Sequence, residues 1–439
     1  MKNFFIILAM KMLHFILKIC GKNGGNLLGK FAFDWNPDIF KYFKVDCPVI
    51  AVTSTNGKTM INNAIGAVFK NSGKKVISNF EGNNMETGIL STILKHCTLT
   101  GKIKADFLVF EVDEGYVPIV FKDFKLDTLV VGNFFRDQLD RNGEVESLIL
   151  KIYNFLKNYN GNLILNNDDP NVARLGKANP NNDNVFYFSV EKYANATTEM
   201  KEAGEGKFCP FCKTRLEYEY YQYSHIGEFH CTNCDFKTPA MDVCGTVKDI
   251  EKREFIYEQN VFHAPQGGLY TMYNCMAVLC VAKKFAIPLK FAEQAFTTIV
   301  VPDGRNEKME YKGHDLILNL VKNPTGANEV MKVIEEDHRK KTILIVLNDH
   351  AQDGRDVSWI YDTFFEKLLN DETSKIITSG TRAYDMALRL KYAGWEKDLT
   401  VIENLEDAVN DLLRCDMTMY AIATYTALQP TRKLLRRES

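Results

Sequence analysis

A run of seven consecutive residues is the first feature of the sequence whose residue types and order suggest a binding site. It consists of Thr53, Ser54, Thr55, Asn56, Gly57, Lys58 and Thr59, between the apolar stretch 48–52 and a helical pattern. At such a strand-to-helix turn, backbone N–H groups can surround phosphate oxygens, a lysine can reach the outer phosphates and a hydroxyl can ligate Mg²⁺. We therefore predict that the run binds a nucleotide. Val52 stands where the generic phosphate loop has glycine, so the loop is a variant form.

Four cysteines form a second candidate site. They are spaced as two CxxC pairs, Cys209/Cys212 and Cys231/Cys234, with 18 residues between the pairs. Such pairs supply four thiolates, the ligand set of a tetrahedral zinc site that leaves no position open for water or substrate. We predict a structural zinc ion here. His225 and His230 lie between the pairs and are interpreted as surface or packing residues and not as ligands.

A third candidate site is the acidic segment 348–362, which follows the apolar run 343–347. Ligands bind beyond the carboxyl ends of strands in folds that alternate strands and helices. Asp349, Asp353 and Asp356 are therefore candidates for a functional role. For Asp349 and Asp362, a helix cap or a polar loop is the simpler interpretation.

The composition limits the class of protein. The chain has 439 residues, about three times a common domain length of roughly 100–150 residues, so we expect two or three domains. With 46% hydrophobic and 25% charged residues, a disordered or fibrous chain is excluded. The net charge of -2 provides no general positive field, so no nucleic-acid partner is expected. Eleven cysteines, an odd number, indicate a reducing compartment, and we expect the cytoplasm.

The first 20 residues are strongly apolar but are interrupted by Lys2, Lys11, His14 and Lys18. Their longest unbroken apolar stretch, residues 4–10, is far shorter than the roughly 20 residues that span a bilayer. We expect an amphipathic helix that packs on its own domain. A helix in peripheral contact with a membrane is the alternative.

Apolar runs separated by helical lengths predict an α/β fold with a largely parallel sheet covered on both faces. The first series of predicted strands is 48–55, 75–78, 107–112, 128–131 and 162–166, with a later helix at 269–286. The second series, after a linker-like stretch at 301–306, is 315–319, 342–348, 375–378, 399–402 and 419–423. We expect a nucleotide-binding domain over residues 1–302 with a small cysteine-rich insert at 204–240. A Rossmann-like α/β domain is expected over residues 303–439.

The loop sequence TSTNGKT resembles the TGTNGKT loop of the Mur ligases and folylpolyglutamate synthases, with Ser54 in place of a glycine. Other motifs resemble Mur ligases in the same order, namely residues 81–84, Glu111, residues 133–140, residues 166–170, Asn274 and residues 304–307. This resemblance implies a P-loop ATPase domain that uses ATP and Mg²⁺. It implies that Thr59 and Glu111 bind the Mg²⁺ ion, with Glu114 as a weaker alternative to Glu111. It also implies that Asn274 and Arg305 contact the nucleotide. Gln138 replaces a histidine at the second metal contact.

The resemblance is narrower in four segments, which are similar to the MurT family: the four-cysteine insert and residues 353–362, 379–387 and 423–428. Its members are the Mur-ligase-like subunits of lipid II isoglutaminyl synthase, and the resemblance covers nearly the whole chain. It implies ATP-dependent amidation of the α-carboxylate of D-glutamate in the lipid II stem peptide, through an acyl phosphate. It also implies a GatD-like glutamine amidotransferase subunit as the source of ammonia, and work at the inner face of the cytoplasmic membrane.

The same resemblance implies that an aspartate of this chain completes the catalytic triad of the partner. Asp356 is the first choice, Asp353 the second and Asp349 the third, while Lys58 and Glu111 would serve phosphoryl transfer. Two alternatives remain open. One is a Mur-type or folylpolyglutamate-type ligase that adds an amino acid, and the other is a zinc-ribbon protein that binds ATP without acylating anything.

Overall fold

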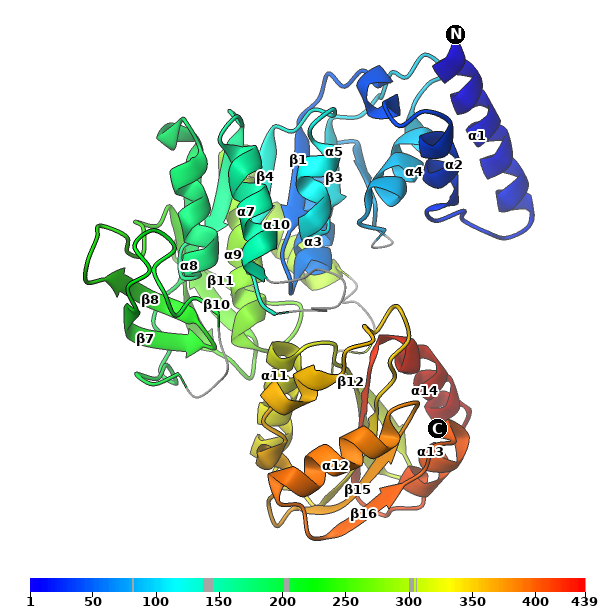
Figure 1. Cartoon of the computed structure of the whole chain (residues 1–439), viewed down its shortest axis with the longest axis vertical. Coiled ribbons are helices and arrows are strands. Elements are labelled where there is room, and N and C mark those ends of the chain that lie inside the picture. The colour runs from blue at the N-terminus through cyan, green and yellow to red at the C-terminus, as the bar shows by residue number, and fades with distance from the viewer. Residues whose placement is uncertain (81–82, 137–144, 201–204, 300–303, 305, 439) are drawn as a thin grey trace. The chain divides into compact units, whose positions relative to one another are not determined.

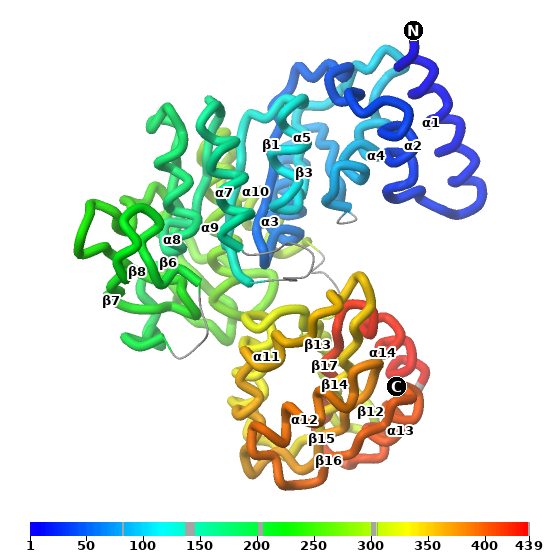
Figure 2. The backbone as a smooth tube through the Cα atoms, in the orientation of Figure 1, coloured from blue at the N-terminus to red at the C-terminus, as the bar shows by residue number. Residues whose placement is uncertain are grey.

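The computed structural model describes residues 1–80, 83–136, 145–200, 205–299, 304 and 306–438. These residues form two compact units, the first made of nearly all described residues up to 299 and the second of those from 304 on. Both units combine sheets with covering helices, and the backbone can be followed by colour from one terminus to the other (Figures 1 and 2). The α/β fold class predicted from the sequence is confirmed.

A nine-stranded sheet, as far as the structure describes it, forms the first unit. The strand order is β11-β10-β9-β6-β5-β4-β1-β3-β2, parallel from β2 to β9 and antiparallel through β10 and β11. The strands are β1 (Val49–Thr53), β2 (Val76–Ser78), β3 (Phe107–Glu111), β4 (Thr128–Val131), β5 (Asn162–Asn166), β6 (Val185–Val190), β9 (Val243–Asp249), β10 (Glu254–Tyr257) and β11 (Asn260–His263).

Helices cover this sheet because its central strands are apolar on both faces. All five residues of β1 are buried, as expected for a parallel strand between two helical layers. Helices α3, α9 and α10 share one core, and Figure 1 shows α5 and α7 in front of the strands. The helices are α1 (Lys2–Ile19), α2 (Leu27–Trp35), α3 (Lys58–Asn71), α4 (Glu86–His96), α5 (Val117–Val120), α7 (Val145–Leu156), α8 (Pro170–Ala173), α9 (Leu269–Lys284) and α10 (Leu289–Thr298).

The cysteine-rich segment forms a small hairpin of its own. Strands β7 (Leu216–Tyr223) and β8 (Ile226–Cys231) pair antiparallel in a separate two-stranded sheet. Its apolar core includes Leu216, Phe229 and Phe236, which pack with Cys209 and Cys231. A core of this size is too small to hold a fold without a further link, and the cysteines can provide one through a metal.

The second unit has a six-stranded sheet of order β12-β13-β17-β14-β15-β16, in which only the β12–β13 pair is antiparallel among the described strands. The strands are β12 (Glu307–Tyr311), β13 (His314–Leu320), β14 (Lys341–Val346), β15 (Thr373–Ser379), β16 (Asp398–Val401) and β17 (Thr418–Ala423). Two cores cover the two faces. The helices are α11 (Pro324–Glu336), α12 (Ala383–Ala393), α13 (Leu405–Leu413) and α14 (Tyr425–Glu438).

All ten strands predicted from apolar runs are present within a few residues of their expected bounds. The apolar runs did not locate β6, β9, β10, β11 and β12, nor β7 and β8, which lie in the predicted cysteine-rich insert. The edge strand β12 (EKMEY) has three charged residues out of five and alternates exposed with half-buried positions, so it contains no apolar run. The predicted linker at 301–306 lies mostly outside the described residues.

Candidate active site

Neighbouring strands bring the phosphate loop and Glu111 together. In the sheet, β1 lies between β3 and β4, and Val52 pairs with Glu111 across the parallel β1–β3 ladder. The carboxyl ends of these strands therefore share one edge of the sheet, where the loop after Thr53 begins and helix α3 starts at Lys58. This is the arrangement that the sequence predicted for nucleotide binding.

Gly57 occupies the one loop position where the backbone requires glycine. Its φ is +90°, in the left-handed region that residues with a Cβ rarely adopt. A Cβ at this position would also lie 2.5 Å from both amide heteroatoms of Asn274 on α9. Asn274 is buried, and its Nδ2 donates to Met60 Sδ at 3.4 Å. The structure thus places Asn274 directly against the loop, while its contact with the nucleotide stays a prediction.

Asn133 braces the phosphate loop from the next strand. Its Oδ1 accepts from the Asn56 backbone N–H at 2.9 Å, and its Nδ2 donates to the Asn56 carbonyl at 3.0 Å. The hydroxyl of Ser54 donates to the same carbonyl at 2.6 Å and accepts from the Asn133 N–H at 3.1 Å. Ser54 keeps a negative φ, so the departure from glycine fits the loop and adds a brace to it.

Lys58 is held by acidic side chains. Its Nζ lies 2.9 Å from Glu114 Oε2 and 3.7 Å from Asp113 Oδ2, and all three side chains are largely buried. Burial by itself lowers the pKa of Lys58, but the charges of Glu114, Asp113 and Glu111 outweigh burial and raise this pKa above its ordinary value. Lys58 is therefore a fixed positive charge at the N-terminus of α3. Glu114 pairs with the lysine here, while Glu111 remains the better metal candidate.

Glu111 has the features of a cation ligand. Its side chain is 2% exposed, and Oε1 accepts from Asn84 Nδ2 at 3.0 Å. Among the described residues, its buried Oε2 has no hydrogen-bond partner. A buried carboxylate oxygen without a partner is costly unless a cation neutralises it. Glu111, with the half-buried Thr59 in the first turn of α3, thus fits the Mg²⁺ that the sequence implied.

Several residues of the motifs at this site cannot be placed. Arg305, residues 81–82 and residues 137–140, including Gln138, lie outside the described residues. Their predicted roles therefore stay predictions. The neighbouring Glu307 is described, and it binds Arg432 and Arg436 of α14 at 2.6 and 3.0 Å. This member of the 304–307 motif thus has a structural role within the second unit.

The 166–170 motif contains two buried aspartates, Asp168 and Asp169, for which the sequence predicted no role. Asp168 is fully buried, and its Oδ2 accepts from the hydroxyls of Ser189 at 2.7 Å and Tyr273 at 2.6 Å. Burial raises the pKa of Asp168 to about 6, although the two hydroxyl donors act in the opposite direction. Because Tyr273 precedes Asn274 on α9, Asp168 links the carboxyl end of β5 to the wall of the candidate nucleotide site.

Asp169 joins the phosphate-loop region to the cysteine hairpin. Its Oδ2 accepts from the Phe134 N–H at 2.9 Å, and its Oδ1 lies 3.4 Å from His225 Nε2. His225 sits in the turn between β7 and β8 and is fully buried. The interpretation of His225 as a packing residue is confirmed. The sequence signal for this contact between Asp169 and the hairpin was the pair of adjacent aspartates in the 166–170 motif.

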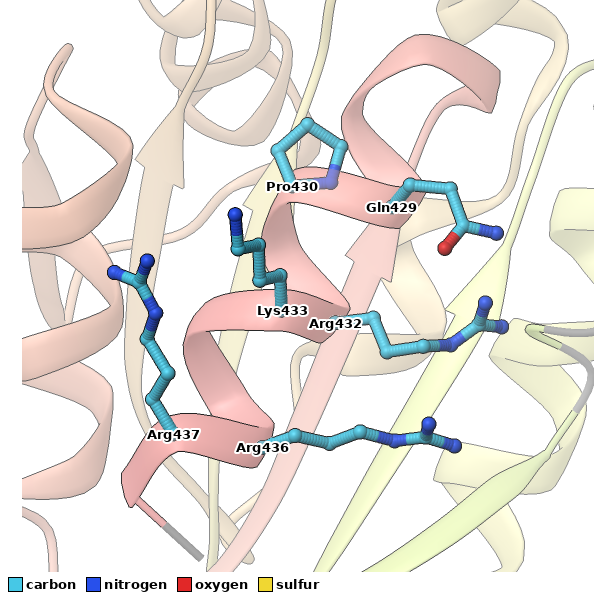
Figure 3. A pocket seen from close by; sticks show the side chains of 6 residues that line it. All are labelled: Gln429, Pro430, Arg432, Lys433, Arg436 and Arg437. Atoms are coloured by element: carbon cyan, nitrogen blue, oxygen red, sulfur yellow. The ribbon is translucent and has the colours of Figure 1, made fainter. Parts of the chain in front are cut away.

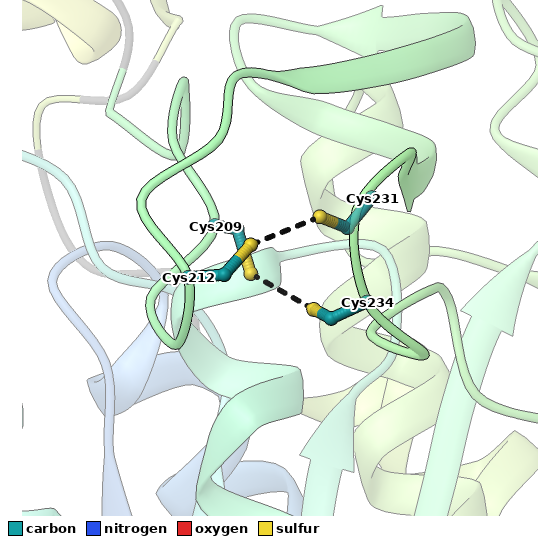
Figure 4. Close-up of side chains that lie close together, drawn as sticks. All are labelled: Cys209, Cys212, Cys231 and Cys234. Carbon is teal, nitrogen blue, oxygen red and sulfur yellow. Dashed lines mark hydrogen bonds between the residues drawn. The ribbon is translucent and has the colours of Figure 1, made fainter.

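The four cysteines converge as predicted. Their Sγ atoms all lie within 4.8 Å of one another, and Figure 4 shows the two pairs facing each other, with Cys209–Cys234 and Cys212–Cys231 Sγ distances of 3.5 and 3.4 Å. Four sulfurs about 2.3 Å from a tetrahedral zinc ion lie roughly 3.8 Å apart. The cluster therefore fits zinc. All four ligand positions would be taken by protein, which indicates a structural role.

The three acidic-loop candidates have different environments at the carboxyl end of β14. Asp353 is buried, and its Oδ1 accepts from the Thr426 N–H at 2.7 Å while its Oδ2 accepts from the Thr426 hydroxyl. It therefore secures the start of α14. Asp349 accepts from the Thr381 hydroxyl at 2.8 Å and from Arg382 at 3.3 Å, so it links to the loop before α12 and is not a helix cap.

Asp356 is the exposed member of this group. Its Oδ1 accepts from the Ser358 N–H at 2.8 Å, and hydrogen bonds from Ser358 lower the pKa of Asp356 below its ordinary value. The carboxylate is therefore charged at neutral pH and open to solvent. Of the three candidates, it is the one best suited to reach a group on another molecule.

A groove on α14 is strongly basic, as Figure 3 shows. It is lined by Gln429, Pro430, Arg432, Lys433, Arg436 and Arg437. Arg432 and Arg436 point away from Lys433 and Arg437 and bind Glu307 of β12. These two cations therefore tie α14 to the edge of its own sheet.

Comparison with known proteins agrees with this geometry. Residues 52–235 match the Mur ligase middle domain, and residues 320–428 match the MurT ligase C-terminal domain. A pseudomurein peptide ligase type C from Methanothermus fervidus shares the fold, with a TM-score of 0.69 and 21% identity, over 92% of this chain and 81% of that chain. The fold and the phosphate loop define a Mur ligase-type protein, a class that uses ATP and Mg²⁺.

Curated relatives narrow the class. The lipid II isoglutaminyl synthase (glutamine-hydrolyzing) subunit MurT of Staphylococcus aureus (strain COL) is 34% identical over 422 residues, 95% of this chain and 94% of the relative. The subunit of the same name from Streptococcus pneumoniae (strain ATCC BAA-255 / R6) is 30% identical over 437 residues, 98% of this chain and 96% of the relative. The chain belongs to the MurT family.

Proposed function

We propose that this chain is the ATP-using subunit of a lipid II isoglutaminyl synthase. It would convert the α-carboxylate of D-glutamate in the lipid II stem peptide to the amide of D-isoglutamine, a step of peptidoglycan synthesis. The observation that carries this proposal is 34% identity to a MurT subunit over 95% of the chain. The phosphate loop, with Lys58 and Glu111 at one sheet edge, supports it.

The chemistry requires activation of the acceptor. A carboxylate is a poor electrophile at neutral pH because it is anionic and has no good leaving group. In the proposed reaction, a carboxylate oxygen attacks the γ-phosphorus of ATP and ADP leaves, which forms an acyl phosphate. Ammonia then attacks the carbonyl carbon, the C–O bond to phosphate breaks, and the nitrogen loses a proton to give the amide and inorganic phosphate.

The residues of this chain serve positioning and charge neutralisation in that reaction. The loop N–H groups at the start of α3 would cradle the phosphates, and Lys58 would neutralise the charge that develops on the transferred group. Glu111 and Thr59 would hold Mg²⁺, which supplies further neutralisation when bound. Asn133 keeps the loop in shape through its two hydrogen bonds to Asn56.

Ammonia would come from a GatD-like glutamine amidotransferase subunit, as the name of the relatives implies. We assign Asp356 as the carboxylate that orients the catalytic histidine of this partner, because it is charged and exposed. Asp353 already binds Thr426 through both oxygens, and Asp349 already binds Arg382. We further assign residues 1–302 to the ATP-binding domain, the zinc ribbon to residues 204–240 and the partner-binding domain to residues 303–439.

The test is an assay with ATP, Mg²⁺, glutamine and lipid II, with and without the GatD-like subunit, in which mass spectrometry detects the amide. Asp356→Asn should abolish glutamine-dependent amidation but keep amidation with free ammonium. Asp371→Asn, at a fully exposed site of the same unit, should behave as the wild type. ATP turnover that does not depend on a D-glutamate acceptor would refute the proposal. A product that gains an amino acid instead of an amide would favour the amino-acid-adding ligase.

A further inference from the structure

The N-terminal helix exposes large apolar side chains on its outer face. Phe5, Met12, Phe15, Ile16 and Ile19 of α1 are 55–71% exposed. Leu27, Phe31 and Trp35 of α2 are exposed as well, and an open groove between the two helices is lined by Phe5, Leu8, Met12 and Trp35 among others. These residues are called here the α1–α2 apolar surface. Contiguous apolar patches on a protein surface mark sites of interaction.

Helical geometry separates this surface from the face that packs on the protein. At 3.6 residues per turn, the five exposed residues of α1 fall within an arc of about 100°. Ile6, Ile7 and Met10 lie on the opposite side and are buried where α1 packs on α2 and α4. Figures 1 and 2 show α1 as the outermost of these three helices. The packed helix expected from the sequence is confirmed, and the exposed stripe is a second apolar face that this packing does not use.

Lysines border the stripe. By the same geometry, Lys2 lies at one edge of the stripe and Lys11 and Lys18 at the other. The chain up to the end of α2, residues 1–35, contains five lysines and one acidic residue, Asp34, although the whole chain has a net charge of -2. This segment of the chain therefore carries a net positive charge. A surface that is apolar in the middle and basic at its edges complements a lipid bilayer that carries anionic headgroups.

The helix is suited to lie on a bilayer and not to cross it. Within the described part of the chain, no helix has both the length and the apolar character needed to span a membrane. Phenylalanine, tryptophan and lysine are the residues that place a surface helix at the boundary between headgroups and acyl chains. A second copy of this chain would cover the apolar stripe, but the lysines on both sides of it would then face one another and repel.

We propose that the α1–α2 apolar surface docks on the face of a lipid bilayer that contains anionic lipids. Helix α1 lies in the plane of the interface, with its apolar stripe toward the acyl chains and its lysines at the headgroup phosphates. This inference extends the proposed function, because it keeps the chain on the surface where a lipid-linked acceptor resides. It can be tested without ATP, lipid II or a partner subunit, so its outcome is independent of that function.

The experiment is flotation of the full chain with vesicles of phosphatidylcholine, alone or mixed with phosphatidylglycerol. The wild type should float with the anionic vesicles, less so as salt is raised, and much less with phosphatidylcholine alone. Phe15→Ser combined with Ile19→Ser should lower the fraction bound by at least about tenfold. The matched control, Phe15→Leu combined with Ile19→Leu, should bind as the wild type. Lys11→Glu combined with Lys18→Glu should weaken binding and remove most of its salt dependence.

Three results would overturn the proposal. The wild type could fail to float with anionic vesicles, or the serine variant could float as well as the leucine variant. Light scattering could instead show a wild-type dimer that the serine substitutions convert to a monomer, which would identify a second copy as the occupant. Unchanged circular dichroism and thermal unfolding of the serine variant would show that it folds, as expected for side chains that are 65% and 71% exposed.

Discussion

Asp168 offers a test of the link between β5 and α9. In the folded chain its carboxyl is fully buried beside the hydroxyls of Ser189 and Tyr273, and its pKa is raised from 3.8 to about 6. The folded state therefore binds a proton more tightly than the unfolded state does. The stability that this proton contributes is fully present below pH 3.8 and is lost as the pH rises through about 6.

The size of the effect follows from the two pKa values. A rise from 3.8 to about 6 corresponds, at about 1.36 kcal/mol per pKa unit, to about 3 kcal/mol. About 2 kcal/mol of this loss falls between pH 4.5 and pH 7.5. For a unit of this size, 1 kcal/mol shifts the melting temperature by about 2 °C, so the wild type should lose about 4 °C over that range from this group.

The perturbation is Asp168→Asn, which removes the titration and keeps an oxygen that accepts hydrogen bonds. Thermal unfolding of both proteins, measured between pH 4.5 and pH 7.5, should show that the variant lacks this component of the pH dependence. Asp183→Asn, at an exposed position of the same unit, should leave the pH dependence of the wild type unchanged. Parallel curves for the wild type and Asp168→Asn would refute the reasoning, whatever their difference in absolute stability.

Three further predictions concern the loop, the cysteine cluster and the acidic segment. Gly57→Ala should lower the affinity for ATP, measured by calorimetry, by at least about tenfold. A residue with a Cβ costs roughly 1–2 kcal/mol in left-handed backbone, and this Cβ would also meet Asn274. Gly73→Ala is the control for backbone strain alone, because Gly73 has a φ of +82° and no atom within 4 Å of the added Cβ. Cys209→Ser should reduce bound zinc, measured by mass spectrometry of the metal, and speed proteolysis between residues 205 and 240; unchanged zinc content would contradict the site. Asp353→Ala should lower the free energy of unfolding of the second unit by about 2–3 kcal/mol, whereas Asp356→Ala should change it by less than about 0.5 kcal/mol.

The sequence by itself determined ten of the strands and the local sites. Apolar runs of strand length located all ten predicted strands, because a parallel strand between two helical layers must be apolar on both faces. The phosphate loop was recognisable because its residues are consecutive, and the cysteine pairs because each CxxC brings two thiolates together within one turn. Such signals are local, so they do not depend on how the chain folds around them.

Only the tertiary structure decided which distant groups meet and which face water. Three contacts join segments that are far apart in the sequence: Lys58 with Glu114, Asp168 with Tyr273, and His225 with Asp169. Asp353 and Asp356 are three residues apart in one acidic loop, yet one is buried and the other is exposed. The apolar N-terminal segment likewise predicted a helix but not which of its faces would be left exposed. Burial and charge pairing depend on what packs against a residue, and that information is not contained in its neighbours along the chain.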